Sequence, residues 1–345
     1  MSIMSPALQR KRIVLAHGGG GQLTDDLVAE LIAPRLSNAF LDPLGDAARL
    51  PMHGGELVFT TDSYVVQPLR FPGGDIGRLA ISGTVNDLAV SGAVPQFISL
   101  ALIIEEGLEL STLEAVLDSI AATAREASVQ VVTGDTKVVG KGQGDGLYIN
   151  TAGIGRLRPG LALGMGHIRP GDVLLVSGTI AEHGLAVMLQ REQADSIRSD
   201  LASDVAPLAG IINDLVAAAG PGLVFMRDPT RGGLAGVAAD LAERSGLHLT
   251  IDENSIPLRP ATRYAAEILG LDPLSVANEG KLMAVVRPEA MSDALQAMRN
   301  HPLGREAAAV GRFENSKDGL CEIVTDVGGR RVIQKPYGEE LPRIC

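Results

Sequence analysis

The sequence of 345 residues contains few cysteines, few aromatic residues and no long apolar segment. Its two cysteines, Cys321 and Cys345, are too few for a disulfide framework or a structural zinc site. Tryptophan is absent and aromatic residues make up 3%, so the core must be aliphatic. No segment reaches the roughly 20 apolar residues of a membrane helix, and the N-terminus lacks the apolar region of a signal peptide. We therefore expect a cytoplasmic protein with reduced thiols and no membrane partner.

The composition is acidic, with a net charge of -11 at pH 7. A surface of this sign repels the phosphates of nucleic acids, so we expect no nucleic-acid partner. Hydrophobic residues make up 46% and charged residues 21%, which is typical of a folded globular protein. Glycine is abundant, with 41 residues, and predicts many places where the backbone turns tightly or approaches a ligand.

The length and the order of hydrophobic patterns predict a two-domain α+β fold. A segment rich in Pro and Gly, 157–171, marks the domain boundary. The polar segment 191–204 is predicted to be a loop or a frayed helix end. The predicted units are an N-terminal segment with a Gly-rich loop, two domains and a flexible C-terminal tail, with the bounds 1–40, 41–160, 161–335 and 336–345.

Periodicity and turn residues predict the individual elements. The helices are expected at 76–91, 110–126, 181–190, 205–219, 233–245 and 288–299. The strands are expected at 57–66, 95–104, 129–135, 148–156, 172–178, 248–252, 281–287, 308–314, 321–326 and 330–335.

Several aspartates stand where apolar runs end, which is where ligand-binding groups often collect. They are Asp46, Asp62, Asp87, Asp135 and Asp228. Carboxylates that converge on one spot repel one another unless a cation is present, so convergence would make a Mg²⁺ site. For any one aspartate taken alone, a turn or capping residue is the favoured interpretation. Asp87 is different, because it lies inside a helical pattern among apolar residues.

The segment DPTRGGLAG predicts a second binding feature. Gly232 and Gly233 open a helix whose free N–H groups could cradle a phosphate, with Arg227 and Arg231 adding positive charge. The alternative is that these glycines only permit close packing. Neither a P-loop nor a Rossmann fingerprint occurs in the required context. The glycine run HGGGG at 17–21 is either a linker or a lid over phosphates.

The two cysteines receive opposite interpretations. Cys321 lies in an apolar strand and is expected in the core. Cys345 ends a tail that contains proline, so its thiol could accept a group at one site and deliver it to another. The alternative for Cys345 is an incidental exposed residue.

Five motifs together resemble one family. They are VNDLAVSGA at 85–93, GDTKVV at 134–139, RDPTRGGLA at 227–235, NEG at 278–280 and PRIC at 342–345. These segments are similar to the HypE family of carbamoyl dehydratases, which act in the maturation of nickel–iron hydrogenases. That family belongs to an ATP-binding superfamily with aminoimidazole ribonucleotide synthetase, selenophosphate synthetase and thiamine-monophosphate kinase. The resemblance extends from about residue 14 to 345.

The resemblance implies a fold and a set of partners. The N-terminal α/β domain would pair with its copy in a homodimer through a β-barrel-like interface, and the C-terminal domain would be α+β. The carbamoyltransferase HypF would load a carbamoyl group on Cys345. The chain would then act as a lyase of the hydro-lyase type, using ATP and Mg²⁺ to convert the carbamoyl group to a thiocyanate. The cyano group would pass to iron on the HypC-HypD complex.

The resemblance also implies roles for individual residues. Cys345 would carry the substrate, Glu279 would be the base and Lys137 would polarise the oxygen or phosphate. The implied metal ligands are Asp46, Asp87 and Asp228. The implied nucleotide-binding residues are Asp46, Asp62, Asn86, Asp87, Asp135, Thr136, Arg231, Gly232 and Gly233.

Two alternatives remain open at this point. A selenophosphate synthetase-like enzyme shares the aspartates, but its nucleophile lies near the N-terminus, where this sequence has His17 and no cysteine. A non-catalytic cyanide carrier would have no use for the aspartates, Lys137 and Glu279 together.

Overall fold

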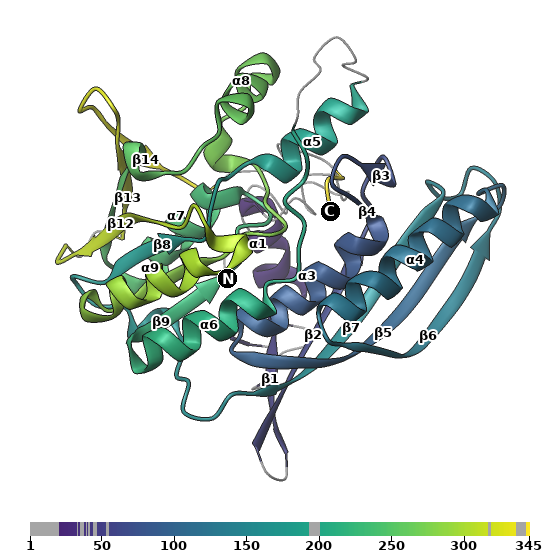
Figure 1. Ribbon diagram of the computed structural model, residues 1–345, viewed down its shortest axis with the longest axis horizontal. Helices are drawn as coiled ribbons and strands as arrows, with labels where there is room; N and C mark the ends of the chain where they lie inside the picture. The colour runs from purple at the N-terminus through teal and green to yellow at the C-terminus, as the bar shows by residue number, and fades with distance from the viewer. Residues whose placement is uncertain are drawn as a thin grey trace.

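The computed structural model describes residues 21–32, 34, 38, 40, 42–43, 47–52, 55–192, 201–316, 319–335 and 343–345. Within these residues the chain forms two large sheets, each with its own helices, which lie side by side (Figure 1). The predicted α+β class is confirmed. None of the described helices combines the length and the apolar character that a membrane span requires.

The first sheet has the strand order β1-β2-β7-β5-β6. Its strands are β1 Ala48–Met52, β2 Gly55–Tyr64, β5 Ala93–Glu105, β6 Gln130–Val139 and β7 Leu147–Leu157. Only β5 and β6 pair in parallel, and helix α4, Leu110–Glu126, connects them. Helices α3, Ile76–Val90, and α4 lie against one face of this sheet (Figure 1). A short hairpin of β3, Arg70–Phe71, and β4, Gly74–Asp75, precedes α3.

Helix α3 is the central element of the molecule. Its N-cap, Asp75, accepts a hydrogen bond from the backbone N–H of Arg78 at 2.8 Å, which satisfies one free donor of the first turn. The helix is buried on nearly every side, because it lies between the first sheet and helix α6, Ala209–Ala219, of the second half. Asp87 near the end of α3 is only partly buried. The helix therefore places this carboxylate at the junction between the halves.

The second sheet has the order β14-β13-β10-β12-β8-β11-β9. Its strands are β8 Val173–Val176, β9 Leu223–Arg227, β10 His248–Asp252, β11 Met283–Val286, β12 Ala308–Glu314, β13 Cys321–Val324 and β14 Arg330–Ile333. Strands β8 and β11 are apolar at every position because the sheet is covered on both faces. Leu174 and Val176 pack on the side of helix α7, Gly233–Ser245. Val173 and Leu175 pack on the side of α6 and of helix α9, Met291–Asn300.

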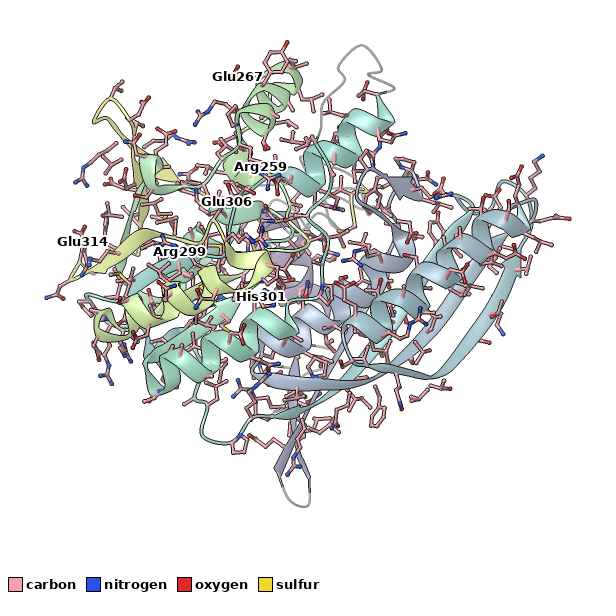
Figure 2. All side chains as sticks on the ribbon, in the orientation of Figure 1. Arg259, Glu267, Arg299, His301, Glu306 and Glu314 are labelled. Carbon is pink, nitrogen blue, oxygen red and sulfur yellow. The ribbon has the colours of Figure 1, made fainter. Side chains whose placement is uncertain are left out.

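The helices of the second half are α5 Glu182–Arg191, α6 Ala209–Ala219, α7 Gly233–Ser245, α8 Pro260–Leu269 and α9 Met291–Asn300. Helices α6 and α9 pack on each other. Near the end of α9, Arg299 donates a hydrogen bond to the carbonyl of Ala307 at 2.8 Å (Figure 2). The short 3-10 helices are η3 Met165–His167, η4 Gly220–Gly222, η5 Glu253–Ser255, η6 Pro273–Ser275, η7 Pro288–Ala290 and η8 Pro302–Gly304. Before β1, α1 Gln22–Leu27 continues into the π-helical turn η2 Val28–Ile32.

The elements differ from the sequence prediction in a few places. Strand β9 and helix α8 were not predicted, because β9 follows Gly-Pro-Gly and the buried positions of α8 are Thr and Ala rather than large apolar residues. Asp62 and Asp135 lie inside β2 and β6, not at the ends of strands. Cys321 is 2% exposed, so its predicted core position is confirmed.

The first sheet is open within the described part of the chain, with β1 and β6 at its edges. A closed β-barrel is therefore not formed by a single copy. The face opposite α3 and α4 exposes large apolar side chains, among them Phe59, Phe97 and Ile103. They alternate along the strands with core residues such as Val58 and Ile98, as a half-covered sheet requires.

Candidate active site

Two cavities meet at the segment 227–231, where β9 leads into α7. The smaller one, the thiol cavity, has a volume of about 130 Å³ and is lined by Asp62, Ser63, Tyr64, Gly83, Asp87, Arg227, Asp228, Thr230, Arg231, Glu279 and Cys345. The larger one, the α7 cavity, has a volume of about 640 Å³ and lies on the other side of the same segment. Arg227, Asp228, Thr230 and Arg231 line both, so a molecule in one cavity is next to a molecule in the other.

The end of the chain lies in the thiol cavity. The backbone N–H of Val65 donates to the carbonyl of Cys345 at 3.2 Å, and that of Gln67 donates to Arg343 at 3.1 Å. Ile344 is 5% exposed and packs in a core cluster to which both halves of the chain contribute. The last three residues are thus docked. Residues 336–342 of the predicted flexible tail lie outside the described residues, and its flexibility stays a prediction.

The charges around Cys345 have opposing effects on its thiol. Burial raises the pKa of Cys345, whereas the Arg231 guanidinium and its hydrogen bond to the thiol lower it. Glu279 and Asp62 raise it further. The pKa of Arg231 is raised in turn, with Cys345 as the main cause. The docked sulfur is therefore held mainly as the neutral thiol, beside a fixed positive charge.

Glu279 is a buried carboxyl group that faces this thiol. It is 2% exposed, and burial raises its pKa well above the ordinary value, with further increases from Asp228 and Asp204. Arg231 opposes this shift. The carboxylate form of a group with a raised pKa is a stronger proton acceptor than an ordinary carboxylate, which is a property expected of a general base.

The backbone around Glu279 is held from two sides. Its N–H donates to Asp204 Oδ1 at 3.1 Å, and its carbonyl accepts from Asn86 Nδ2 at 3.2 Å. A Cβ atom at Gly280 would lie 1.8 Å from the carbonyl oxygen of Asp204, so only glycine permits this approach. The NEG motif thus combines the buried carboxyl group of Glu279 with Gly280, which allows the backbone of Asp204 to approach closely.

Three of the predicted aspartates line the thiol cavity: Asp62, Asp87 and Asp228. Asp87 Oδ2 accepts from Thr60 Oγ1 at 3.0 Å. Asp62 Oδ2 accepts from Tyr64 Oη at 3.3 Å. Tyr64 is buried, and a Cβ at Gly83 would lie 2.4 Å from its Oη, so the glycine makes room for the phenol.

Among the described residues no group of three His, Cys, Asp or Glu side chains is arranged to hold a metal ion. Asp46, one of the three predicted metal ligands, lies outside the described residues, as does most of the glycine run 17–21. Mg²⁺ usually binds proteins through one or two carboxylates together with substrate phosphates. Asp87 and Asp228 in one cavity fit that pattern.

The other predicted nucleotide-binding residues are placed differently. Asn86 is fully buried and uses its amide on backbone groups, donating to Ala206 O at 3.1 Å and accepting from Leu208 N at 2.7 Å. It therefore joins the two halves and lines neither cavity. Gly232 lines the α7 cavity, and a Cβ on the neighbouring Gly233 would lie 2.5 Å from two carbonyl oxygens of segment 274–276.

Asp135, Thr136 and Lys137 lie together on the exposed edge strand β6. Lys137 Nζ is 3.3 Å from Asp135 Oδ2, and both side chains are largely exposed. Neither the thiol cavity nor the α7 cavity includes these residues. The motif GDTKVV does not indicate whether its strand lies in the middle of the sheet or at an edge. The resemblance alone therefore placed Asp135, Thr136 and Lys137 at the site of Cys345.

Sequence reasoning also missed residues that the structure places at the site. Lys335 and Arg244 line the α7 cavity, and with Arg227 they surround the buried carboxylate of Asp240. Tyr64, which lines the thiol cavity, is a third residue that was missed. These are isolated residues without a motif, and only the two-residue period of β2, which places Tyr64 on the same face as Val58, could have indicated Tyr64.

Both halves of the chain match family models. Residues 44–157 match the N-terminal domain of AIR synthase related proteins, and residues 169–322 match their C-terminal domain. The fold and the junction site therefore define an AIR synthase related protein.

Particular relatives narrow this class. The chain is 46% identical over 351 residues to "Carbamoyl dehydratase HypE" of Rhizobium leguminosarum bv. viciae, which covers 100% of both chains. The structure "Crystal structure of HypE-HypF complex" is 42% identical with a TM-score of 0.84, covering 90% of this chain and 99% of that one. "Crystal Structure of Hydrogenase Maturation Protein HypE in complex with ATP" is 40% identical with a TM-score of 0.81, covering 97% and 100%. The chain belongs to the HypE family of carbamoyl dehydratases.

Proposed function

We propose that this enzyme uses ATP to dehydrate a carbamoyl group carried on Cys345, which leaves a thiocyanate on the sulfur. One observation carries the proposal: the thiol cavity places Cys345 with Glu279 and Arg231, and it shares the segment 227–231 with a cavity large enough for a nucleotide. The solved HypE complex with ATP supports a nucleotide site in this fold.

The α7 cavity is the proposed ATP site. Cationic side chains, Arg227, Arg244 and Lys335, gather around Asp240 at its wall. Helix α7 begins there at Gly233, and a helix start favours anions through its free N–H groups. Phosphates directed toward segment 227–231 would reach Asp228 and Arg231, which face the thiol cavity as well.

Asp87 and Asp228 would hold Mg²⁺ together with the phosphates, and the ion would neutralise charge during phosphoryl transfer. The carbamoyl oxygen is a poor leaving group until it is phosphorylated. In the first step that oxygen takes the γ-phosphoryl group of ATP, ADP leaves, and the nitrogen loses one proton. In the second step the C–O bond breaks, phosphate leaves with both electrons of that bond, and the nitrogen loses its second proton to form C≡N.

Glu279 is the proposed acceptor of the protons from nitrogen. Its burial beside Asp228 and Asp204 raises its pKa, which makes the carboxylate a better base. Arg231 would stabilise the negative oxygen that develops as phosphate departs. Both groups are fixed before the reaction, so little reorganisation is needed.

The proposed partners act before and after this step. HypF would load the carbamoyl group, in keeping with the solved HypE-HypF complex. Burial disfavours the thiolate in the docked tail, so loading is favoured when Cys345 is outside the cavity. The product would pass its cyano group to iron on HypC-HypD. A soft sulfur carrier suits transfer to a metal, which supports cysteine in this position.

Asp87→Ala is expected to lower ATP-dependent dehydration at least about 100-fold, because one of the proposed metal-binding carboxylates is lost. Carbamoyl loading by HypF should remain. The two steps are measured separately by intact mass, with Asp118→Ala on the exposed side of α4 as the matched control. Equal loss of both steps would show that Asp87 has a structural role only.

A homodimer is also proposed, formed through the open face and β6 edge of the first sheet. The evidence is the apolar surface that this sheet exposes, with Phe97 41%, Ile103 42% and Val138 68% exposed. Lys137, Asp135 and Thr136 lie on that edge. The catalytic role proposed for Lys137 and the nucleotide-binding roles proposed for Asp135 and Thr136 therefore require a second copy or a movement of β6.

Phe97→Glu is expected to convert the dimer to a monomer, because it places a charge on the apolar face. Sedimentation or light scattering would measure the mass. Leu110→Glu changes a residue that is 75% exposed on α4 and should leave the dimer intact. A Phe97→Glu protein that remains dimeric would exclude this face as the interface.

A further inference from the structure

His183 is a buried residue that the proposed reaction does not use. It lies in the first turn of α5 and is completely shielded from solvent. Its ring packs edge-on against Phe71, with ring centroids 5.3 Å apart. Both ring nitrogens have hydrogen-bond partners, and these partners define what the residue does.

The hydrogen bonds of His183 determine its tautomer. Nε2 lies 2.6 Å from the carbonyl oxygen of Ile344, which can only accept, so Nε2 carries the proton and donates. Burial lowers the pKa of His183, in keeping with a neutral ring. Nδ1 must then accept, and Ser203 Oγ donates to it at 2.8 Å. The backbone N–H of Val205 donates to the same hydroxyl at 3.1 Å.

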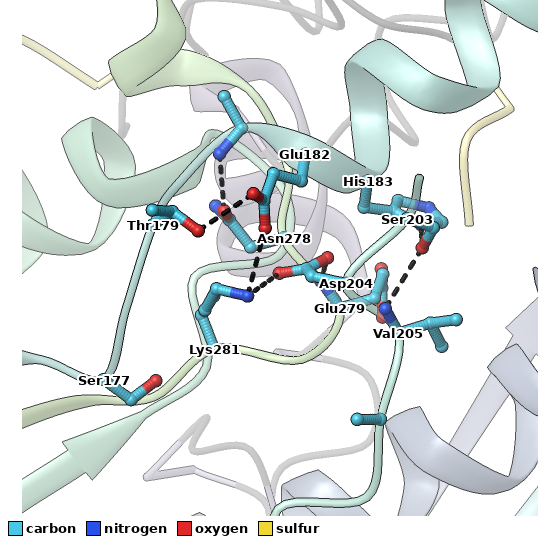
Figure 3. A network of polar contacts seen from close by, with 12 residues as sticks. Ser177, Thr179, Glu182, His183, Ser203, Asp204, Val205, Asn278, Glu279 and Lys281 are labelled. Carbon is cyan, nitrogen blue, oxygen red and sulfur yellow. Dashed lines mark hydrogen bonds and ion pairs between the residues drawn. The ribbon is translucent and has the colours of Figure 1, made fainter. Parts of the chain in front are cut away.

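Ser203 is followed directly by the residue that holds the proposed base. Asp204 Oδ1 accepts from the backbone N–H of Glu279 at 3.1 Å, and Asp204 Oδ2 is 3.1 Å from Lys281 Nζ. Figure 3 shows these contacts in one network. The segment 203–205 therefore contacts both His183, which binds the end of the chain, and the backbone of Glu279, the proposed base.

The same network also includes Glu182, the residue that precedes His183. Lys281 Nζ is 3.4 Å from Glu182 Oε2, and Glu182 also accepts from Thr179 at 2.9 Å and pairs with Arg259 at 3.1 Å. Glu182 and Lys281 are both buried, so each charge depends on the others for compensation. The start of α5, segment 203–205 and residues 279–281 are thus connected in one network of polar contacts.

We propose that His183 is a positioning residue: by binding the carbonyl of Ile344 it sets the docked Cys345 against Glu279. This inference rests on the proposed function, since positioning matters only if chemistry occurs on the docked sulfur. Ile344 is the residue next to Cys345, and its carbonyl is bound in a fully buried contact. Arg343 is held further from the thiol: its carbonyl accepts hydrogen bonds from Gln67 N at 3.1 Å and from Arg191 Nη2 at 2.8 Å, and its side chain pairs with Asp145.

The test measures how fast iodoacetamide alkylates Cys345 in the full-length protein, with peptide mass mapping to assign the site. His183→Phe keeps a ring against Phe71 but loses the donor to Ile344, and the rate at Cys345 should rise about tenfold, the factor that corresponds to one buried hydrogen bond. His183→Gln retains a donor and should restore a rate near that of the unchanged protein. His167→Phe, at an exposed histidine, is the matched control and should change nothing.

Cys321 reports unfolding in the same experiment. It is buried and its pKa is raised to about 12, so it reacts only if the second domain opens. Faster alkylation at Cys345 alone supports the inference. An unchanged rate at Cys345 in His183→Phe overturns the inference, and a rise at both cysteines overturns it as well. Restoration of the rate in His183→Gln is the check on folding.

A second arm compares loading and dehydration. His183→Phe should keep carbamoyl loading and lose about tenfold in dehydration of the loaded protein. If alkylation rises while dehydration stays unchanged, His183 holds the tail without positioning the reacting group, and the inference fails. If the unchanged protein does not dehydrate its carbamoyl group, the proposed function fails, whereas the alkylation result still tests the contact itself.

Discussion

Cys345→Ala is expected to abolish both carbamoyl loading and thiocyanate formation, because no other thiol can take its place. Cys321, the second cysteine, is 2% exposed and its pKa is raised to about 12, so almost none of it is thiolate near neutral pH. The thiolate is the nucleophile that attacks the carbamoyl donor. Intact mass spectrometry after incubation with ATP, carbamoyl phosphate and HypF should show no adduct on the variant.

The matched control is Cys321→Ala. It removes a small buried side chain from the hydrophobic core of the second half and should lower the free energy of unfolding by about 1 kcal/mol or slightly more. Loading and dehydration should both remain. An adduct that survives Cys345→Ala, or one that maps to Cys321, would contradict the role of Cys345 as carrier.

Glu279→Gln is expected to lower the rate of dehydration about 100-fold to 10,000-fold, the range that a positioned general base contributes. The substitution keeps the size of the side chain and the backbone hydrogen bonds to Asp204 and Asn86. It removes only the proton acceptor that faces Cys345 in the thiol cavity. Loading by HypF should be unchanged, and the loaded protein should accumulate in the presence of ATP.

Glu267→Gln is the control for this substitution, because Glu267 is an exposed residue on helix α8 at the edge of the molecule (Figure 2). It should dehydrate its carbamoyl group at the ordinary rate. A Glu279→Gln protein that is equally fast would show that another group takes the protons from nitrogen. Loss of loading together with dehydration would instead indicate that the variant is misfolded.

The sequence was informative about elements that obey a clear period and about residues close to a motif. Helices α3 and α4 follow the predicted bounds to within one residue, because their apolar positions repeat with helical spacing. The thiol cavity contains Cys345, Glu279 and Arg231, together with the predicted aspartates Asp62, Asp87 and Asp228. These residues belong to segments that end at the junction of the two halves.

The remaining features depend on how distant segments meet. The predicted nucleotide-binding role of Asn86 stays a prediction, and the sequence gives no sign that its amide bonds to Ala206, Leu208 and Glu279. Lys137 follows the predicted strand, but that strand is the edge of the sheet. His183 has no motif at all, and its contact with Ile344 joins residues far apart in the chain. Pairing order and buried polar contacts of this kind are not encoded in local periodicity.

A time course of intact mass most directly tests whether Cys345 carries a group that ATP dehydrates. With HypF and carbamoyl phosphate the protein should first gain about 43 Da, as S–H becomes S–CONH₂. After ATP is added, the gain should fall to about 25 Da relative to the unmodified protein, as S–CONH₂ becomes S–C≡N. A gain that stays at about 43 Da with ATP, or a protein that never gains mass at Cys345, would contradict the proposed reaction.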